Sequence, residues 1–225
     1  MRIARIENCA LAEFADAITA VVFFQGCDMD CSFCQNPELI PKMKDDTTWQ
    51  EVVKLIQWNY VDWLSLTGGE PLIQEWDSVH KLMQFAKQNN VKVNIDTNGT
   101  MTPIKMKNLW HSQDLIDCIS VSIKQIGNTI KTRYTLNALY INNLIDKTRF
   151  RVVVVDENSI PLDEKIASLF LGKHVSKIQI LPNSKQGRGV NLPVPTPELL
   201  DKIIRFYGDL GMEFWYNASQ TQNFK

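Results

Sequence analysis

The sequence predicts an α/β fold, a partial (β/α)6 barrel with a mostly parallel sheet and outer helices. Short β-branched or aromatic runs alternate with amphipathic segments along the chain, the pattern of βα units joined by right-handed crossovers. The unbroken run Val152–Val155 suits a strand buried on both faces. A complete eight-unit barrel takes about 250 residues, whereas this chain has 225. We therefore expect an open barrel that forms a single domain over residues 1–225.

The expected strands are short segments rich in valine, isoleucine and aromatic residues, and turn residues bound most of them. They alternate with the expected helices, so that successive strands run parallel. The last of these strands is short. In chain order the strands are Ile18–Phe24, Val61–Leu66, Val91–Ile95, Ile116–Ile123, Phe150–Val155, Val175–Leu181 and Met212–Tyr216.

Capping residues mark several helix starts between these strands. Thr48 and Glu51 form a capping box, and Thr102-Pro103 and Thr196-Pro197 each place an N-cap threonine before a first-turn proline. Between these caps, apolar residues recur at helical spacing. The expected helices begin at Thr48, span Trp76–Gln88, begin at Thr102, span Thr135–Ile145 and Leu162–Phe170, and run from Thr196 to Gly208.

Composition excludes several classes of protein. The chain has 24 Lys+Arg against 25 Asp+Glu, which argues against a general binder of nucleic acid or acidic membranes. Its longest apolar stretch, Ala17–Phe24, is far too short to span a bilayer, and the N-terminus lacks the apolar core of a signal peptide. Five cysteines are too few and too clustered for a disulfide scaffold. We expect a reduced, cytoplasmic protein without membrane or nucleic-acid partners.

Three of the cysteines share one loop directly after the first expected strand. Cys27, Cys31 and Cys34 follow a C-x3-C-x2-C spacing. Three thiolates this close can hold three corners of a [4Fe-4S] cluster and leave the fourth iron open to a small molecule. The alternative is a zinc site that takes Cys9 as its fourth ligand, although such sites more often use paired C-x2-C or Cys/His groups.

The second expected strand ends in Thr67-Gly68-Gly69-Glu70. Two glycines let the backbone turn and let a ligand approach closely, and a carboxylate at Glu70 suits a cationic amine. The alternative interpretation is an ordinary turn between a strand and a helix.

Polar residues also end the third and fourth expected strands. Asp96-Thr97-Asn98-Gly99 closes the third, where Asn-Gly is a turn signal but leaves Asp96 unexplained. Ser122 and Lys124 close the fourth and share a face, and such a lysine can hold a carboxylate. All four motifs fall at the same end of successive strands, where α/β folds place their chemistry.

These motifs resemble those of the radical S-adenosylmethionine (radical SAM) enzymes. The triple-cysteine loop, with Phe33 before its last cysteine, is similar to the family's cluster motif, and Gly68-Gly69-Glu70 is similar to its second motif. The segments 24–27, 34–39 and 95–100 resemble the glycyl radical enzyme activases. The nearest subgroup is the activating proteins of anaerobic ribonucleoside-triphosphate reductases, which lack an inserted ferredoxin domain.

The resemblance implies an activity. A [4Fe-4S] cluster would bind S-adenosyl-L-methionine, and an external one-electron donor such as flavodoxin or ferredoxin would reduce it. Reductive cleavage would give methionine and a 5′-deoxyadenosyl radical, which abstracts a hydrogen atom from a glycine of a partner glycyl radical enzyme subunit. The cofactors perform the difficult chemistry, while the protein binds and orients them. An open cluster is sensitive to oxygen and implies anaerobic conditions.

The resemblance also implies roles for individual residues. Cys27, Cys31 and Cys34 would bind the cluster. The remaining positions would contact S-adenosylmethionine or the partner: Gly68, Gly69 and Glu70 at the methionine amino group, Ser122 and Lys124 at the ribose and carboxylate, Asp96 and Asn98 at the adenosyl group or the partner's glycine segment, Phe33 at the adenine, and Arg151 in the cofactor wall.

Two features leave alternatives open. Activases usually carry an aspartate where this chain has Ser122, and a serine there is similar to the 7-carboxy-7-deazaguanine synthases, radical SAM enzymes that act on a small molecule. A non-catalytic zinc- or cluster-binding module is a third possibility. The segment Asn183–Gly189 is either a loop that docks a partner or a simple turn.

Overall fold

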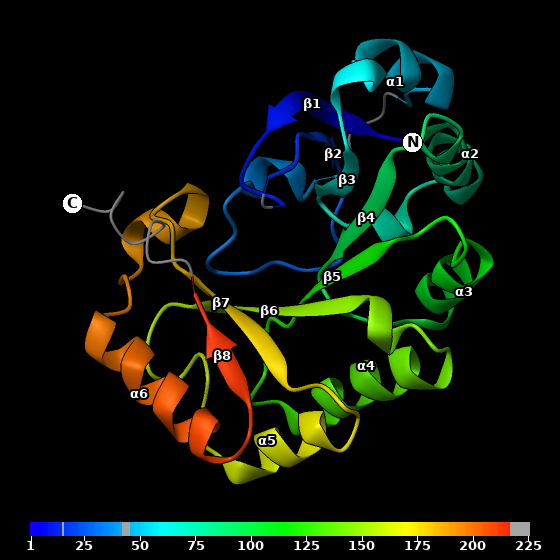
Figure 1. Cartoon of the computed structure of the whole chain (residues 1–225). Coiled ribbons are helices and arrows are strands. Elements are labelled where there is room, and N and C mark those ends of the chain that lie inside the picture. The colour runs from blue at the N-terminus through cyan, green and yellow to red at the C-terminus, as the bar shows by residue number, and fades with distance from the viewer. Residues whose placement is uncertain (15, 42–45, 217–225) are drawn as a thin grey trace. The chain divides into compact units, whose positions relative to one another are not determined.

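The computed structural model describes residues 1–14, 16–41 and 46–216 and contains an eight-stranded sheet (Figure 1). The strands lie in chain order across it: β1 Ile3–Ala10, β2 Thr19–Phe24, β3 Trp63–Gly68, β4 Lys92–Thr97, β5 Cys118–Ser122, β6 Thr148–Val154, β7 Lys177–Pro182 and β8 Glu213–Trp215. β1 is antiparallel to β2, whereas β2–β3, β3–β4, β6–β7 and β7–β8 are parallel pairs. The predicted α/β class with a mostly parallel sheet is confirmed.

Helices separate the strands as the sequence predicts. Their bounds are α1 Trp49–Leu55, α2 Trp76–Gln88, α3 Pro103–His111, α4 Thr129–Ile141, α5 Glu164–Leu171 and α6 Pro197–Asp209. The predicted start of α4 at Thr135 is wrong. The helix begins earlier because Asn128 caps it, its side chain accepting a hydrogen bond from the Lys131 N–H at 3.1 Å.

β1 was not predicted; it precedes the first predicted strand, which corresponds to β2. Its residues are half-buried or exposed, and charged side chains such as Arg5 and Glu7 interrupt its apolar pattern. The Arg5 guanidinium lies 3.8 Å from the centre of the Phe23 ring on β2. Packing of this kind lets a polar strand occupy a sheet edge without a periodic apolar signal in its sequence.

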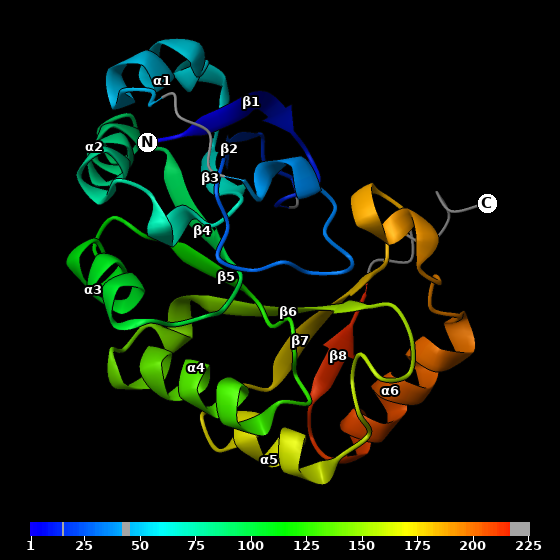
Figure 2. The same cartoon turned by 180° about the vertical axis from the view of Figure 1, so that it is seen from behind.

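The chain divides into two compact units. The first comprises Met1–Asp30, Glu38–Thr97 and Thr102–Ser120, and the second Cys31–Pro37, Asn98–Met101 and Val121–Lys225. In the first unit, α2 packs against α1 and β4, and buries Val79, Leu82, Met83 and Ala86 (Figure 2). In the second, α6 packs on β8, where the rings of Tyr207 and Phe214 stack at 4.5 Å.

No helix in the described ranges is long and apolar enough to cross a membrane.

Candidate functional site

The turn after β3 is in close contact with the start of the cysteine loop. A Cβ atom on Gly69 would lie 2.1 Å from the Gly26 carbonyl oxygen, and one on Gly68 would lie 2.5 Å from the Phe24 nitrogen. The Glu70 N–H donates a hydrogen bond to the same Gly26 carbonyl at 2.8 Å. Gly68 also has a φ of +98°, which favours glycine. Both glycines are therefore required by the close approach of two backbone segments.

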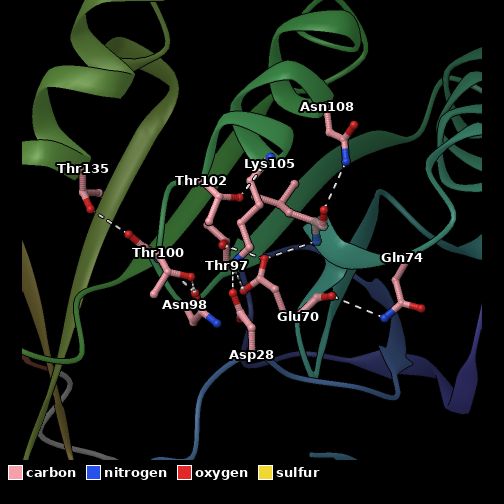
Figure 3. Close-up of polar contacts among 12 residues, drawn as sticks. Asp28, Glu70, Gln74, Thr97, Asn98, Thr100, Thr102, Lys105, Asn108 and Thr135 are labelled. Carbon is pink, nitrogen blue, oxygen red and sulfur yellow. Dashed lines mark hydrogen bonds and ion pairs between the residues drawn. The ribbon is translucent and has the colours of Figure 1, made fainter. Parts of the chain in front are cut away.

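The side chain of Glu70 is fully buried and lies beside a buried ammonium group of the protein itself (Figure 3). Its Oε2 is 3.7 Å from the Nζ of Lys105. Its Oε1 accepts hydrogen bonds from the Thr97 hydroxyl at 2.8 Å and from the Leu72 N–H at 3.2 Å. These contacts hold the carboxylate in place; its predicted role at the methionine amino group stays a prediction.

The ends of β3 and β4 are joined through their side chains. The Thr67 hydroxyl donates to the Asp96 carboxylate at 3.1 Å. Asp96 is half-buried, and the next residue, Thr97, contacts Glu70. The structure thus brings the predicted Asp96 and Gly68-Gly69-Glu70 sites together within the first unit.

In the second unit, the Asn98-Gly99 turn lies against the end of β5. The Asn98 side-chain oxygen accepts hydrogen bonds from the Thr100 N–H and hydroxyl, at 3.0 and 2.7 Å. Gly99 has a φ of +78°, and a Cβ there would lie 3.3 Å from the Ser122 carbonyl oxygen. Two predicted site residues, Asn98 and Ser122, are therefore neighbours, and each is buried.

Lys124 and Phe33 are also brought together. The Lys124 Nζ lies 5.7 Å from the centre of the Phe33 ring, within the range of a cation–π contact. Arg151 on β6 is buried, and its carbonyl accepts a hydrogen bond from the Ile123 N–H at 2.8 Å. These three predicted residues belong to the second unit together with Cys31 and Cys34.

The loop after β7 holds the Cys31–Cys34 segment by its backbone. The Arg188 N–H donates to the Cys34 carbonyl at 2.9 Å, and its guanidinium donates to the Cys31 carbonyl at 3.5 Å. A Cβ on Gly187 would lie 2.3 Å from the Gln35 carbonyl oxygen. The segment Asn183–Gly189 thus packs on the cysteine loop, a contact that neither of its two predicted roles anticipated.

The five cysteines, all within the described residues, form no disulfide. Cys27, Cys31 and Cys34 are half-buried, and Cys9 is exposed on β1. Within residues 1–14, 16–41 and 46–216, no three His, Cys, Asp or Glu side chains are gathered closely enough to hold one metal ion. The ligand role of the three cysteines, and that of Cys9 in the zinc alternative, therefore stay predictions. Cysteine thiolates are the usual ligands of iron–sulfur clusters, and backbone hydrogen bonds hold this loop near Cys27 and at Cys34.

Two residues that contact the predicted motifs were missed. Lys105 lies in the first turn of α3, where a lysine is ordinarily solvated, and nothing in its neighbourhood marks it as buried. Arg188 lies in a glycine-rich loop more than a hundred positions from the cysteines. Both become evident only through contacts between segments that are distant in sequence.

Comparison with known proteins identifies the family to which the chain belongs. Residues 21–144, more than half of the chain, match the Radical SAM superfamily. The chain therefore belongs to the radical SAM superfamily. In the crystal structure of Streptococcus suis SuiB bound to precursor peptide SuiA, the fold is similar: the TM-score is 0.62 at 13% identity, covering 85% of this chain and 46% of that one.

Two relatives carry names that refer to activating enzymes. The chain is 31% identical over 119 residues to a Methanocaldococcus jannaschii protein named "Putative glycyl-radical enzyme activating enzyme", covering 53% of this chain and 48% of that relative. It is 26% identical over 208 residues to the pyruvate formate-lyase-activating enzyme of Streptococcus mutans, covering 79% and 77%. The chain thus spans about half the length of the first relative and about three quarters of the second.

Proposed function

We propose that this protein is a glycyl radical enzyme activase that uses a [4Fe-4S] cluster and S-adenosyl-L-methionine. One electron, one S-adenosylmethionine and one glycine Cα–H of the partner are consumed; methionine, 5′-deoxyadenosine and a glycyl radical are formed. The cluster, when bound, supplies the electron that breaks the sulfonium bond. An external donor such as flavodoxin or ferredoxin replenishes that electron, and the partner is a glycyl radical enzyme of the anaerobic ribonucleotide reductase kind.

The observation that carries this proposal is the contact between the two principal motifs. The cysteine loop begins at the end of β2, and its Gly26 carbonyl accepts a hydrogen bond from Glu70 and lies against Gly69. The start of the loop that would hold the cluster is thus adjacent to the turn that would hold the methionine end of the cofactor, before either cofactor binds. Cys27, Cys31 and Cys34 would each hold one iron of the cluster.

Other residues of the chain would position the rest of the cofactor. Phe33 and Lys124 lie together, and in this proposal they contact the adenine and the carboxylate. Ser122 and Asn98 border the same turn and would meet the ribose and the adenosyl group or the partner. In this proposal Asp96, on β4, would contact the adenosyl group or the partner, and Arg151, on β6, would belong to the cofactor wall. Burial of Asn98, Ser122 and Arg151 would limit water near the reacting group.

The test uses a partner enzyme labelled with dideuterated glycine. The chain is reconstituted anaerobically with iron and sulfide, reduced, and mixed with S-adenosylmethionine and a panel that includes an anaerobic ribonucleotide reductase and a pyruvate formate-lyase. We expect visible absorption from the cluster, a glycyl radical EPR signal on one partner, and deuterium in the 5′-deoxyadenosine measured by mass spectrometry. The labelled position identifies the hydrogen donor directly.

Cysteine variants provide the controls. Cys31→Ala should abolish the cluster absorption and the radical, whereas Cys118→Ala, on β5, should retain both. Cys9→Ala should also retain them, because the zinc alternative alone needs the exposed Cys9 thiol. A colourless protein that binds zinc would overturn the radical SAM chemistry. Unlabelled 5′-deoxyadenosine formed during conversion of a small heterocycle, with no partner radical, would overturn only the activase assignment.

A further inference from the structure

Lys105 is a charged side chain in the interior of the protein. Its side chain is fully buried, which is rare for lysine unless the ammonium is paired. The Nζ lies 2.9 Å from the Asp28 carboxylate and 3.7 Å from the Glu70 carboxylate. One ammonium group from α3 therefore contacts two acidic residues that lie in different segments of the chain (Figure 3).

Those two segments are the ones that carry the principal motifs. Asp28 directly follows Cys27 in the cysteine loop, and Glu70 ends the Gly68-Gly69-Glu70 turn. All the residues of this ion cluster belong to the first unit. The same loop is already held by backbone hydrogen bonds, from the Gly26 N–H to Leu39 at 2.8 Å and from the Cys27 N–H to Ile40 at 3.1 Å. The ion cluster adds a side-chain link one residue beyond Cys27.

Global stability is a weak reason for such a group. Burying an ammonium and a carboxylate carries a desolvation penalty that their mutual attraction often does not exceed, and an apolar side chain of similar volume often serves stability equally well. The fully buried Lys105–Glu70 pair does, however, fix geometry, because each charge accepts few alternative positions once it is out of water. Asp28, whose side chain is 31% exposed, attaches the loop to that fixed ammonium. The two partners of Lys105 indicate what is fixed: the position of the cysteine loop relative to the Glu70 turn.

We propose that Lys105 is a positioning residue that presets the cysteine loop on the Gly68-Gly69-Glu70 turn before any cofactor binds. Asp28 is the loop's point of attachment, and Glu70 is the attachment on the turn. This inference rests on the proposed function for its meaning, because the preset loop is the one that would hold the cluster. Its physical content, a loop made rigid by one ammonium group, concerns the chain alone.

The test is hydrogen exchange of the cofactor-free protein, measured by mass spectrometry on peptides that contain Gly26 and Cys27. Asp28→Ala removes the loop's attachment and leaves the Lys105–Glu70 pair in place. Asp114→Ala makes the same change at an exposed carboxylate in the turn after α3, within the same unit, and is the matched control. Loss of a charge-assisted hydrogen bond should speed local opening about tenfold. We expect that acceleration in Asp28→Ala and not in Asp114→Ala, with peptides of α5 and α6 unchanged in both.

A second measurement distinguishes positioning from simple structural support. The reduced, reconstituted protein is titrated with S-adenosylmethionine, and the change in its EPR spectrum reports binding. Asp28→Ala should load as much iron as the wild type, yet need about tenfold more S-adenosylmethionine at half-saturation. Lys105→Met should show both effects. If Lys105→Met fails to fold, the comparison of the two aspartate variants still decides the question.

The outcomes separate this inference from the proposed function. Equal exchange and equal titration midpoints in Asp28→Ala and Asp114→Ala would overturn the positioning role even if the wild type activates a partner. A wild type that binds no cluster would sink the proposed function, whereas the exchange result would stand unaffected.

Discussion

Replacement of Gly69 by alanine tests the contact on which the proposed function depends. A Cβ at this position would lie 2.1 Å from the Gly26 carbonyl oxygen, and real Cβ atoms essentially never approach within 3.0 Å. Since 3.0 − 2.1 = 0.9 Å, the backbone of the cysteine loop or of the turn must move by about that distance. The obstacle is backbone rather than a flexible side chain, so no rotamer change can relieve it.

The energetic cost follows from two terms. Forcing an extra carbon into a packed site costs about 1–3 kcal/mol, and stretching the hydrogen bond from the Glu70 N–H to Gly26 costs about 1 kcal/mol more. Together they amount to about 2–4 kcal/mol, which lowers the Tm of a chain of this size by roughly 5–15 °C. The variant should also load less iron on reconstitution, because the loop that carries Cys27 is displaced.

The assay is thermal unfolding followed by circular dichroism, with iron content measured in parallel. Gly208→Ala is the matched control: it makes the same chemical change in α6, where an added Cβ meets nothing within 4 Å. Alanine is the better helix former, so this control should keep or raise the Tm, by up to about 1 kcal/mol of added stability. A Gly69→Ala protein with wild-type Tm and iron content would refute the close-contact argument.

Two further predictions concern other parts of the chain. Asn183 is buried, and its side-chain amide donates to the carbonyls of Gly189, Leu192 and Pro193. Asn183→Ala should therefore lower the free energy of unfolding in urea by about 1–3 kcal/mol and speed hydrogen exchange at the Arg188 amide. Unchanged exchange at that amide would contradict the role of Asn183 in shaping the loop. Glu75 caps α2, and the hydrogen bond from the Ser78 side chain, followed by backbone N–H groups, lowers its pKa from 4.5. Because the pKa of Glu75 is lowered in the folded protein, the stabilisation from its charge is present above its ordinary pKa and is lost as the pH falls through the folded pKa. Glu75→Gln should therefore lower the Tm at pH 7 and match the wild type in acid. An equal loss of Tm at both pH values would exclude the charge as the cause.

Strands and caps with strong local signals were predictable from the sequence. The apolar runs of β2 to β7 and the threonine caps of α1, α3 and α6 are signals formed by residues close together in the sequence. They can therefore be predicted without a structure. β1 could not be predicted in this way because its residues are half-buried or exposed and form no apolar run. The start of α4 was predicted too late, at Thr135, because the buried apolar residues of the helix, Leu136 and Leu139, lie in its second half.

The site residues also differ in whether their signal is local in the sequence. The cysteines and Gly68-Gly69-Glu70 were found because short motifs at strand ends carry their own spacing. Lys105 could not be found, since a lysine in a helix's first turn is ordinarily solvated and only the positions of Asp28 and Glu70 make it exceptional. Contacts between distant segments are the information that a sequence pattern lacks.

Residues of the cysteine loop belong to both compact units, and each part of the loop is held within its own unit. In the first unit, Cys27 is fixed by backbone hydrogen bonds and, one residue on, by the Asp28–Lys105 ion pair. In the second, the Cys31 and Cys34 carbonyls accept from Arg188, over a Gly187 that has no room for a side chain. Every residue from Cys27 to Cys34 is half-buried or exposed, so little buried apolar surface orders the loop. Its order must therefore come from these backbone and charged contacts. The donors of these contacts, and not the loop sequence alone, then determine the positions of the three cysteines, each within its own unit.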